Sequence, residues 1–295
     1  MGMNGAQTIE LATTSSGKTH SDENFPVASL LIAPALRAPI LAFYDFVRAA
    51  DDVADNAALA PEHKLALLDR LESALLGEGP DEPVARRLRE ALNGRGLSPR
   101  HAQDLLRAFR RDVTELRYRD WDDLIDYCRY SAMPVGRFVL DLHGEDPERT
   151  WALNDALCAA LQINNHLQDC GKDYRSLDRV YLPQDFLAAE GAEIAMLGEE
   201  RAPPPLRAAI AAIARRNAEL LASARPFAGR IADLRLALEV GAIHRVAEYL
   251  AARLAVADPL SEKVHAAKAQ FLALAAAGAV STLLLRSVAR AGGAA

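Results

Sequence analysis

The sequence has little of several features that point to particular classes of protein. Only 3 of its 295 residues are cysteines, with no CxxC spacing, so neither a disulfide scaffold nor a structural zinc site is expected and a reducing cytoplasm fits best. It has no GxGxxG, Walker or GxSxG motif, the usual signatures of dinucleotide, nucleotide and serine-hydrolase sites. The net charge of −6, from 34 basic and 40 acidic residues, gives no indication of nucleic acid binding.

Strand patterns are also missing, because no stretch alternates apolar and polar residues with the Val, Ile and Thr content of a sheet. Alanine, leucine, arginine and glutamate, which favour helices, fill nearly every segment. We expect a single all-α domain over 21–290, an isoprenoid synthase-type bundle around a central cavity, with a flexible segment at 1–20 and a tail at 291–295. The expected helices are 34–55, 62–76, 83–92, 98–118, 121–142 with a break at Met133-Pro134, 147–174, 184–190, 206–223, 228–255 and 260–288, with loops at 175–184 and 201–205.

No segment of the sequence is predicted to be a leader or a membrane anchor. The first twenty residues lack the basic start and apolar run of a secretory signal. The most membrane-like stretch, from Lys268 to Arg286, contains Gln270, Ser281 and Thr282 and is rich in alanine, whereas a spanning helix needs about 20 strongly apolar residues. We expect a terminal core helix there, with peripheral membrane contact as the alternative.

The first expected helix ends in an acidic patch. Asp51 and Asp55 are four residues apart, so their carboxylates lie on one helical face about one turn apart. Like charges at this spacing repel, and the negative end of the helix dipole adds to the cost. A compensating partner is therefore expected, and Arg48 and Tyr44 lie on the adjoining surface.

A second acidic patch lies late in the expected helix 147–174. Polar side chains occupy the i, i+3, i+7 and i+11 positions that usually form the buried stripe of an amphipathic helix. Because a polar stripe among apolar residues is costly unless it faces a wet or metal-filled cavity, we expect it to line such a cavity. The stripe consists of Gln162, Asn165, Asp169 and Asp173.

Two interpretations of the paired carboxylates remain open at this point. A single DxxxD pattern is common on exposed helix faces, but two pairs on separate long helices favour a function. Carboxylate oxygens suit Mg²⁺, which usually takes one or two carboxylates and completes its coordination with water and substrate phosphate. The one ExxH unit, Glu262 and His265, is interpreted as part of a surface helix, since diiron bundles use such units in pairs.

Taken in order, these motifs resemble the squalene/phytoene synthase family of head-to-head prenyl transferases, from about Ser21 to the second loop. The resemblance implies the isoprenoid synthase fold and an enzyme that acts on a prenyl diphosphate. It is carried by Tyr44, Arg48, Asp51 and Asp55, by Tyr130 in Tyr127–Ala132, by Gln162, Asn165, Asp169 and Asp173, and by Asp178–Pro183.

Within the family, 21–29 and 134–137 resemble the bacterial branch that converts presqualene diphosphate to hydroxysqualene in hopanoid synthesis. The resemblance implies that a relative makes this substrate and that another enzyme reduces the product, so functional coupling to other hopanoid enzymes is implied and NADPH is not expected. Two residues depart from the family pattern: Met133 stands where a polar residue is expected, and Asp178 where many relatives have glycine.

The resemblance also implies roles for individual residues. Several Mg²⁺ ions would bridge the diphosphate to Asp51, Asp55, Asn165, Asp169 and Asp173. The remaining implied residues act on the substrate: Arg48 on the phosphates, Tyr44 and Tyr130 on the carbocation or the diphosphate, and Asn24, Phe25, Gln162 and Arg179 as further contacts.

Two alternatives stand beside this assignment. A condensing relative would make presqualene diphosphate or phytoene from two prenyl diphosphates. The other alternative is a catalytically silent scaffold on the same fold, which would gain nothing from carboxylates that repel one another.

Overall fold

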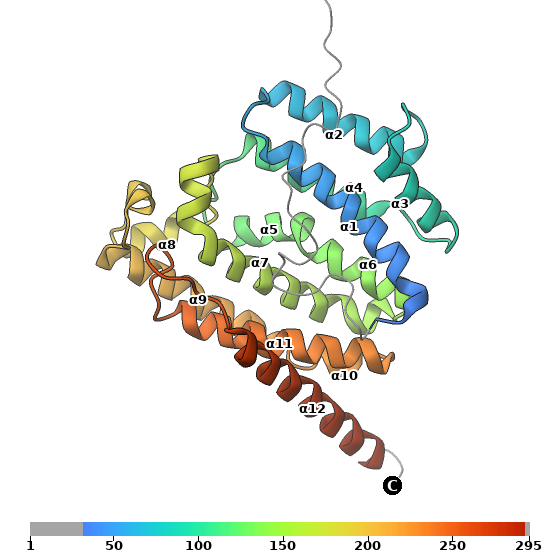
Figure 1. The fold of residues 1–295 in the computed structure, drawn as a ribbon. Helices are drawn as coiled ribbons and strands as arrows, with labels where there is room; N and C mark the ends of the chain where they lie inside the picture. The colour runs from blue at the N-terminus through green and yellow to red at the C-terminus, as the bar shows by residue number, and fades with distance from the viewer. Residues whose placement is uncertain (1–31, 293–295) are drawn as a thin grey trace, which may run out of the picture. The chain divides into compact units, whose positions relative to one another are not determined.

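The computed structural model describes residues 32–292, and these residues are predominantly helical (Figure 1). The extended pairing within this range is an isolated bridge between Arg117 and Val180. The predicted all-α class is therefore confirmed, while the predicted N-terminal segment and the last three residues lie outside the described range. Among described residues, one compact unit comprises 38–114 and a second comprises 32–37 and 115–292, so the single domain stays a prediction.

The first unit contains four helices, whose starts follow from proline placement. Proline is tolerated in the first helical turn, where its missing N–H has no intrahelical partner. Arg110 of the fourth helix pairs with Glu72 of the second at 2.7 Å. The helices are α1 (Pro34–Asp55, of which 34–37 group with the second unit), α2 (Pro61–Leu76), α3 (Pro83–Asn93) and α4 (Arg100–Thr114).

The second unit is built around one long helix, α7 (Pro147–Leu177). Buried apolar residues of α6, α7, α9, α10 and α11 form one core, including Leu140, Leu157, Leu221 and Leu236. The elements are α5 (Trp121–Ser131), α6 (Met133–His143), α7, α8 (Gln184–Ala189), η2 (Ile194–Gly198), α9 (Pro204–Ala224), α10 (Phe227–Arg230), α11 (Leu234–Leu254) and α12 (Lys268–Gly292).

Two buried asparagines join α7 to its neighbours. Asn164 Nδ2 donates to Ala247 O on α11 at 3.1 Å, and Asn217 Nδ2 on α9 donates to Asn164 Oδ1 at 3.0 Å. Buried amides cost free energy unless they are hydrogen-bonded, so these bonds also specify how the three helices meet. They fix the rotation of α7 and therefore the direction in which its polar stripe points.

Four predicted helix boundaries were wrong. The helix expected over 98–118 ends at Thr114, because Leu116 O accepts a hydrogen bond from Val180 N at 3.0 Å. The helix expected over 228–255 is two helices, since Asp233 caps α11 by accepting from Leu236 N at 2.8 Å. The loop expected at 201–205 is shorter because prolines begin α9, and 260–267 precede α12 instead of opening it.

The prediction of a terminal core helix was also wrong. In α12, Leu284 and Leu285 are 63% and 68% exposed. By length and composition, Lys268–Ser287 is the one described helix that is able to cross a membrane, and 11% of its best window is buried. The helix packs on α11 along one side and leaves apolar residues uncovered on the others.

Candidate functional site

The acidic end of α1 contains the compensating partner that the sequence led us to expect. Arg48 donates to Asp51 Oδ2 at 2.6 Å and to Asp52 Oδ1 at 2.9 Å, so one guanidinium serves two carboxylates. The Asp51 side chain is 30% exposed and that of Arg48 is 17% exposed, so the ion pair is partly shielded from solvent. Tyr44 and Asp55 are also half-buried. The Asp51–Asp55 pair therefore lies beside a positively charged side chain, that of Arg48.

The polar stripe of α7 is accessible at its centre. Asn165 and Asp169 are exposed and Asp173 is half-buried, whereas the intervening Asn164 and His166 are buried. This alternation follows from helical geometry, because Asn164 faces α9 and α11 and so turns Asn165 outward. The structure therefore places the predicted stripe on a solvent-accessible side of α7.

Gln162, at the start of the stripe, is held by a buried histidine one turn later. Gln162 Nε2 and His166 Nε2 are 3.2 Å apart, and the His166 ring stacks on Tyr181 with centroids 3.7 Å apart and planes 12° apart. Burial lowers the pKa of His166 to about 3, and the nearby Arg179 guanidinium adds to this effect. A neutral His166 can accept at Nε2 from the Gln162 amide, which fixes how the amide is turned.

The segment after α7 is held in an unusual backbone conformation. Asp178 has φ +51° and caps α7 in the left-handed region, where glycine is normally preferred. Its carboxylate accepts from Arg117 Nη2 at 2.6 Å, and its carbonyl accepts from Arg117 Nη1. The aspartate at this glycine-favouring position is thus held by a charge contact. The next residue, Arg179, is buried.

The predicted break at Met133-Pro134 is confirmed, and it explains what Met133 contributes. Helix α5 ends at Ser131 and α6 begins at Met133, with Ala132 between them at φ −125° and ψ −48°. Met133 is buried and its carbonyl accepts from Asn154 Nδ2 of α7 at 3.2 Å. The backbone, and not a polar side chain at 133, supplies the contact at this break. Tyr130 lies at the end of α5 and is half-buried.

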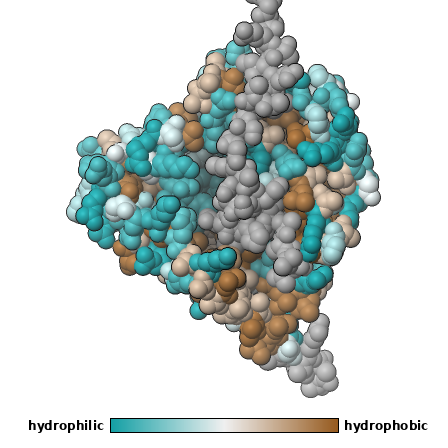
Figure 2. All heavy atoms as spheres, in the orientation of Figure 1, coloured by the Kyte–Doolittle hydropathy of each residue, from teal (hydrophilic) through white to brown (hydrophobic). Residues whose placement is uncertain are grey.

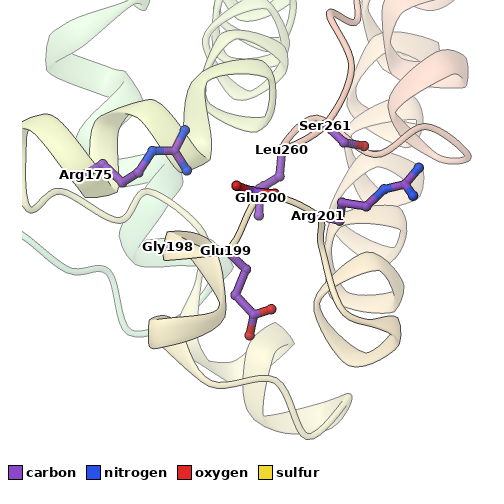
Figure 3. A pocket seen from close by; sticks show the side chains of 7 residues that line it. All are labelled: Arg175, Gly198, Glu199, Glu200, Arg201, Leu260 and Ser261. Carbon is purple, nitrogen blue, oxygen red and sulfur yellow. The ribbon is translucent and has the colours of Figure 1, made fainter.

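Arg175, two residues after Asp173, lines an open pocket. Its Nη1 donates to Leu197 O at 3.2 Å. Figure 3 shows Arg175 on one side of this pocket and Arg201 and Ser261 on the other, with Glu199 below. The pocket has a volume of about 550 Å³ and mixes basic and acidic side chains, so we assign no diphosphate contact to Arg175.

The carboxylates of α1 and α7 meet only some of the requirements of a magnesium site. Among residues 32–292, no group of three or more His, Cys, Asp or Glu side chains is placed to hold a metal ion. Each helix offers a pair of carboxylates one turn apart, which suits an ion that also binds water and phosphate oxygens. The residues fit magnesium that binds together with a diphosphate, and they do not form a closed cage for the metal alone.

The predicted site residues come from both compact units and from the N-terminal segment. Asn24 and Phe25 lie outside the described residues. Asp51 and Asp55 belong to the first compact unit, and Asn165, Asp169 and Asp173 to the second. The structure therefore brings the predicted residues together within each helix, and their joint action stays a prediction.

Sequence reasoning missed residues that support the stripe. His166 is not a member of the polar stripe, yet its contact with Gln162 follows from i, i+4 spacing. The ring cluster of Tyr118, Tyr127 and Tyr181 had no signal in the sequence, because its members lie on separate segments. Tyr181 is 5.4 Å from Tyr127 and 5.6 Å from Tyr118 between ring centroids.

An all-α fold in which α1 and α7 each carry a pair of carboxylates one turn apart has the features expected of a synthase that acts on a prenyl diphosphate. A family model described as squalene/phytoene synthase matches residues 18–292, and the chain belongs to this family. It is thereby an enzyme of the prenyl diphosphate-processing class, as predicted, which sets the silent scaffold aside.

Particular relatives are similar over almost the whole chain. A hydroxysqualene synthase of Rhodopseudomonas palustris is 56% identical, covering 92% of each chain, and that of Zymomonas mobilis is 51% identical, covering 93% of each. A phytoene synthase of Pseudescherichia vulneris is 31% identical and covers 70% of this chain and 68% of its own.

Solved structures agree with the fold. The squalene synthase HpnC of Alicyclobacillus acidocaldarius is 34% identical with a TM-score of 0.69, covering 83% of this chain and 91% of its own. A dehydrosqualene synthase solved with a ligand is 22% identical with a TM-score of 0.72, covering 91% and 94%. The second likeness supports the fold alone.

Proposed function

We propose that the protein is a hydroxysqualene synthase that converts presqualene diphosphate and water to hydroxysqualene and diphosphate. The observation that carries this proposal is the near-full-length similarity, at 51–56% identity, to three proteins with that name. The three cysteines, none in a disulfide, support a reducing cytoplasmic location. Coupling to enzymes that supply the substrate and reduce the product is part of the same proposal.

The carboxylates of α1 and those of α7 are proposed to act on the diphosphate through magnesium. Asp51, Asp55, Asn165, Asp169 and Asp173 would hold magnesium, which supplies the positive charge that a departing diphosphate needs. The accessibility of Asn165 and Asp169, beside the buried Asn164 and His166, supports this assignment.

Arg48 would change partners when substrate binds. Its two contacts to Asp51 and Asp52 balance these carboxylates in the ligand-free protein. Phosphate oxygens accept charge-assisted hydrogen bonds from arginine as carboxylates do, so Arg48 could turn toward the diphosphate once magnesium balances the charge of Asp51. Arg179, from the loop after α7, is proposed as a second phosphate contact.

The chemistry then breaks one bond and forms another. The carbon–oxygen bond to the diphosphate breaks with both electrons on the leaving oxygen, and a cyclopropylcarbinyl cation remains. The ring faces of Tyr44 and Tyr130 would stabilise this cation, and after rearrangement a water oxygen bonds to the cationic carbon and loses a proton. Gln162, turned by His166, is proposed as a substrate contact, with Asn24 and Phe25 at the entrance.

Product analysis tests the activity. Purified protein with Mg²⁺ is given presqualene diphosphate in one reaction and farnesyl diphosphate in another, and the products are identified by mass spectrometry. We expect hydroxysqualene from the first and no turnover of the second. The similarity to phytoene synthases favours a condensing enzyme as the second candidate, and consumption of farnesyl diphosphate with release of a condensed product would establish it.

A further inference from the structure

Helix α12 presents an apolar surface that nothing in the described structure covers. We define the α12 patch as the exposed residues Leu272, Val280, Leu283, Leu284 and Leu285, together with Leu234 at the start of α11. Figure 2 shows hydrophobic atoms gathered at the bottom of the molecule, where Figure 1 places α12. From Ala269 to Leu285 the helix has no charged residue, whereas an exposed helix face is normally polar.

The other side of α12 is fastened to α11 at points spread along its length. Tyr249 OH donates to Gln270 Oε1 at 3.0 Å near the beginning of α12. At the middle, Gly278 faces Gly241 so closely that a methyl group on Gly278 would come within 2.9 Å of Ala242 Cα. Near the end, Arg286 donates to Ala232 O at 3.1 Å. A helix held in this way lies along the body of the unit and cannot cross a bilayer alone.

Basic side chains outnumber acidic ones around the α12 patch, because the two carboxylates at the adjoining turn, Glu145 and Asp233, are taken up by backbone N–H groups. Helix α12 carries Lys268 and Arg286 at its two ends and has no acidic residue, in a chain whose net charge is −6. Arg286 also contacts the turn between α10 and α11. The arginines on either side of this turn, Arg230 and Arg235, are exposed. An apolar helix with basic residues at its margins matches an anionic lipid surface, where each lysine or arginine adds attraction to the headgroups.

A second copy of the chain fits this surface less well. Pairing two α12 helices in either direction would place basic ends against basic ends, with no acidic side chain on α12 to balance them. We propose that the α12 patch docks flat on the surface of a bilayer that contains anionic phospholipid, with its leucines among the acyl chains. This inference goes beyond the proposed reaction and does not depend on it.

Vesicle binding tests the proposal with the full chain. The protein is sedimented with vesicles of phosphatidylcholine alone and with vesicles that also contain phosphatidylglycerol. We expect at least tenfold stronger binding to the second kind. Absence of binding to either kind, or equal binding to both, would overturn the proposal.

Variants locate the binding surface. Leu284→Glu/Leu285→Glu and the milder Leu284→Ser/Leu285→Ser should each weaken binding at least tenfold, with an unchanged circular dichroism spectrum, because both leucines are exposed. Leu76→Glu/Val256→Glu changes two exposed apolar residues outside the patch and should bind as wild type. Unchanged binding by the first two variants would contradict the proposal. So would a wild-type dimer in light scattering that the Leu284→Glu/Leu285→Glu variant converts to a monomer.

Discussion

At the scale of single residues, the carboxylates of α1 and α7 make the sharpest test of the site. Asp51→Asn and Asp169→Asn should each reduce turnover of presqualene diphosphate by at least a hundredfold, because an amide gives up the negative charge that holds a cation. Both side chains have solvent access, so the unfolding temperature should stay near that of wild type. Product formation and thermal unfolding measure the two effects.

A matched control lies on the same helix as Asp51. Asp45 pairs with Arg87 at 3.5 Å and is assigned no role in the site, so Asp45→Asn should keep the wild-type rate. Wild-type turnover by Asp51→Asn or Asp169→Asn would remove that residue from the proposed ligands.

His166 is predicted to act on Gln162 and not on the substrate. His166→Phe keeps an aromatic ring over Tyr181 but removes the acceptor for the Gln162 amide, so kcat should fall by roughly tenfold, as for other residues that orient site groups. The fraction of hydroxysqualene among the products should fall as well. His63→Phe, on the exposed surface of α2, is the control. An unchanged product fraction would show that this contact has no part in positioning.

At the scale of helices, the crossing of α6 and α7 depends on Gly136. A methyl group there would overlap the side-chain oxygen of Asn154 and come within 2.7 Å of Cys158 Sγ. Gly136→Ala should therefore lower the free energy of unfolding by about 1–3 kcal/mol, the usual cost of overpacking. Gly229→Ala, in α10, meets nothing within 4 Å and serves as control. Denaturant unfolding compares them, and equal stability would contradict the close approach.

Helix starts were predictable where a proline marks the first turn, whereas the starts of α11 and α12 were not. Prolines marked the first turns of α1, α2, α3, α6 and α7, because proline acts through its own ring and missing N–H. The end of α4 was missed because it depends on Val180, more than sixty residues later, which a local pattern does not contain. The exposure of α12 was missed for a related reason. An alanine- and leucine-rich helix has the composition of a core helix, and only its neighbours decide how much of it is covered.

For the molecule as a whole, magnesium and diphosphate should bind together. Because no described group of three acidic or other ligating side chains forms a metal site, Mg²⁺ alone should bind weakly. Inorganic pyrophosphate should bind at least tenfold more tightly with Mg²⁺ than without it, by reciprocal coupling. Calorimetry measures both affinities, with Mg²⁺ titrated into pyrophosphate as the blank.

Turnover should also depend on Mg²⁺. EDTA should stop the reaction and added Mg²⁺ should restore it. Tight Mg²⁺ binding to the protein alone, or turnover that continues in EDTA, would contradict the proposed use of the carboxylates.

The sequence predicted which helices carry the site, but not how their side chains are paired. The stripe from Gln162 to Asp173 followed from periodicity, since a polar row at buried spacing is costly unless it faces water or a ligand. The pairing of Arg48 with both Asp51 and Asp52 did not, because either spacing alone suits a helical ion pair. The tyrosine cluster around His166 needed long-range packing that periodicity does not describe.

The left-handed aspartate at the end of α7 has a consequence for how related chains diverge. Glycine at 178 would relax the backbone by about 1 kcal/mol but would release the side-chain tether to Arg117. In homologues with glycine at 178, selection for arginine at 117 should be weak, because the carboxylate that Arg117 contacts is gone. Homologues with aspartate at 178 should retain arginine at 117. Replacements at these two positions should therefore be correlated across homologues, even though about sixty residues separate them.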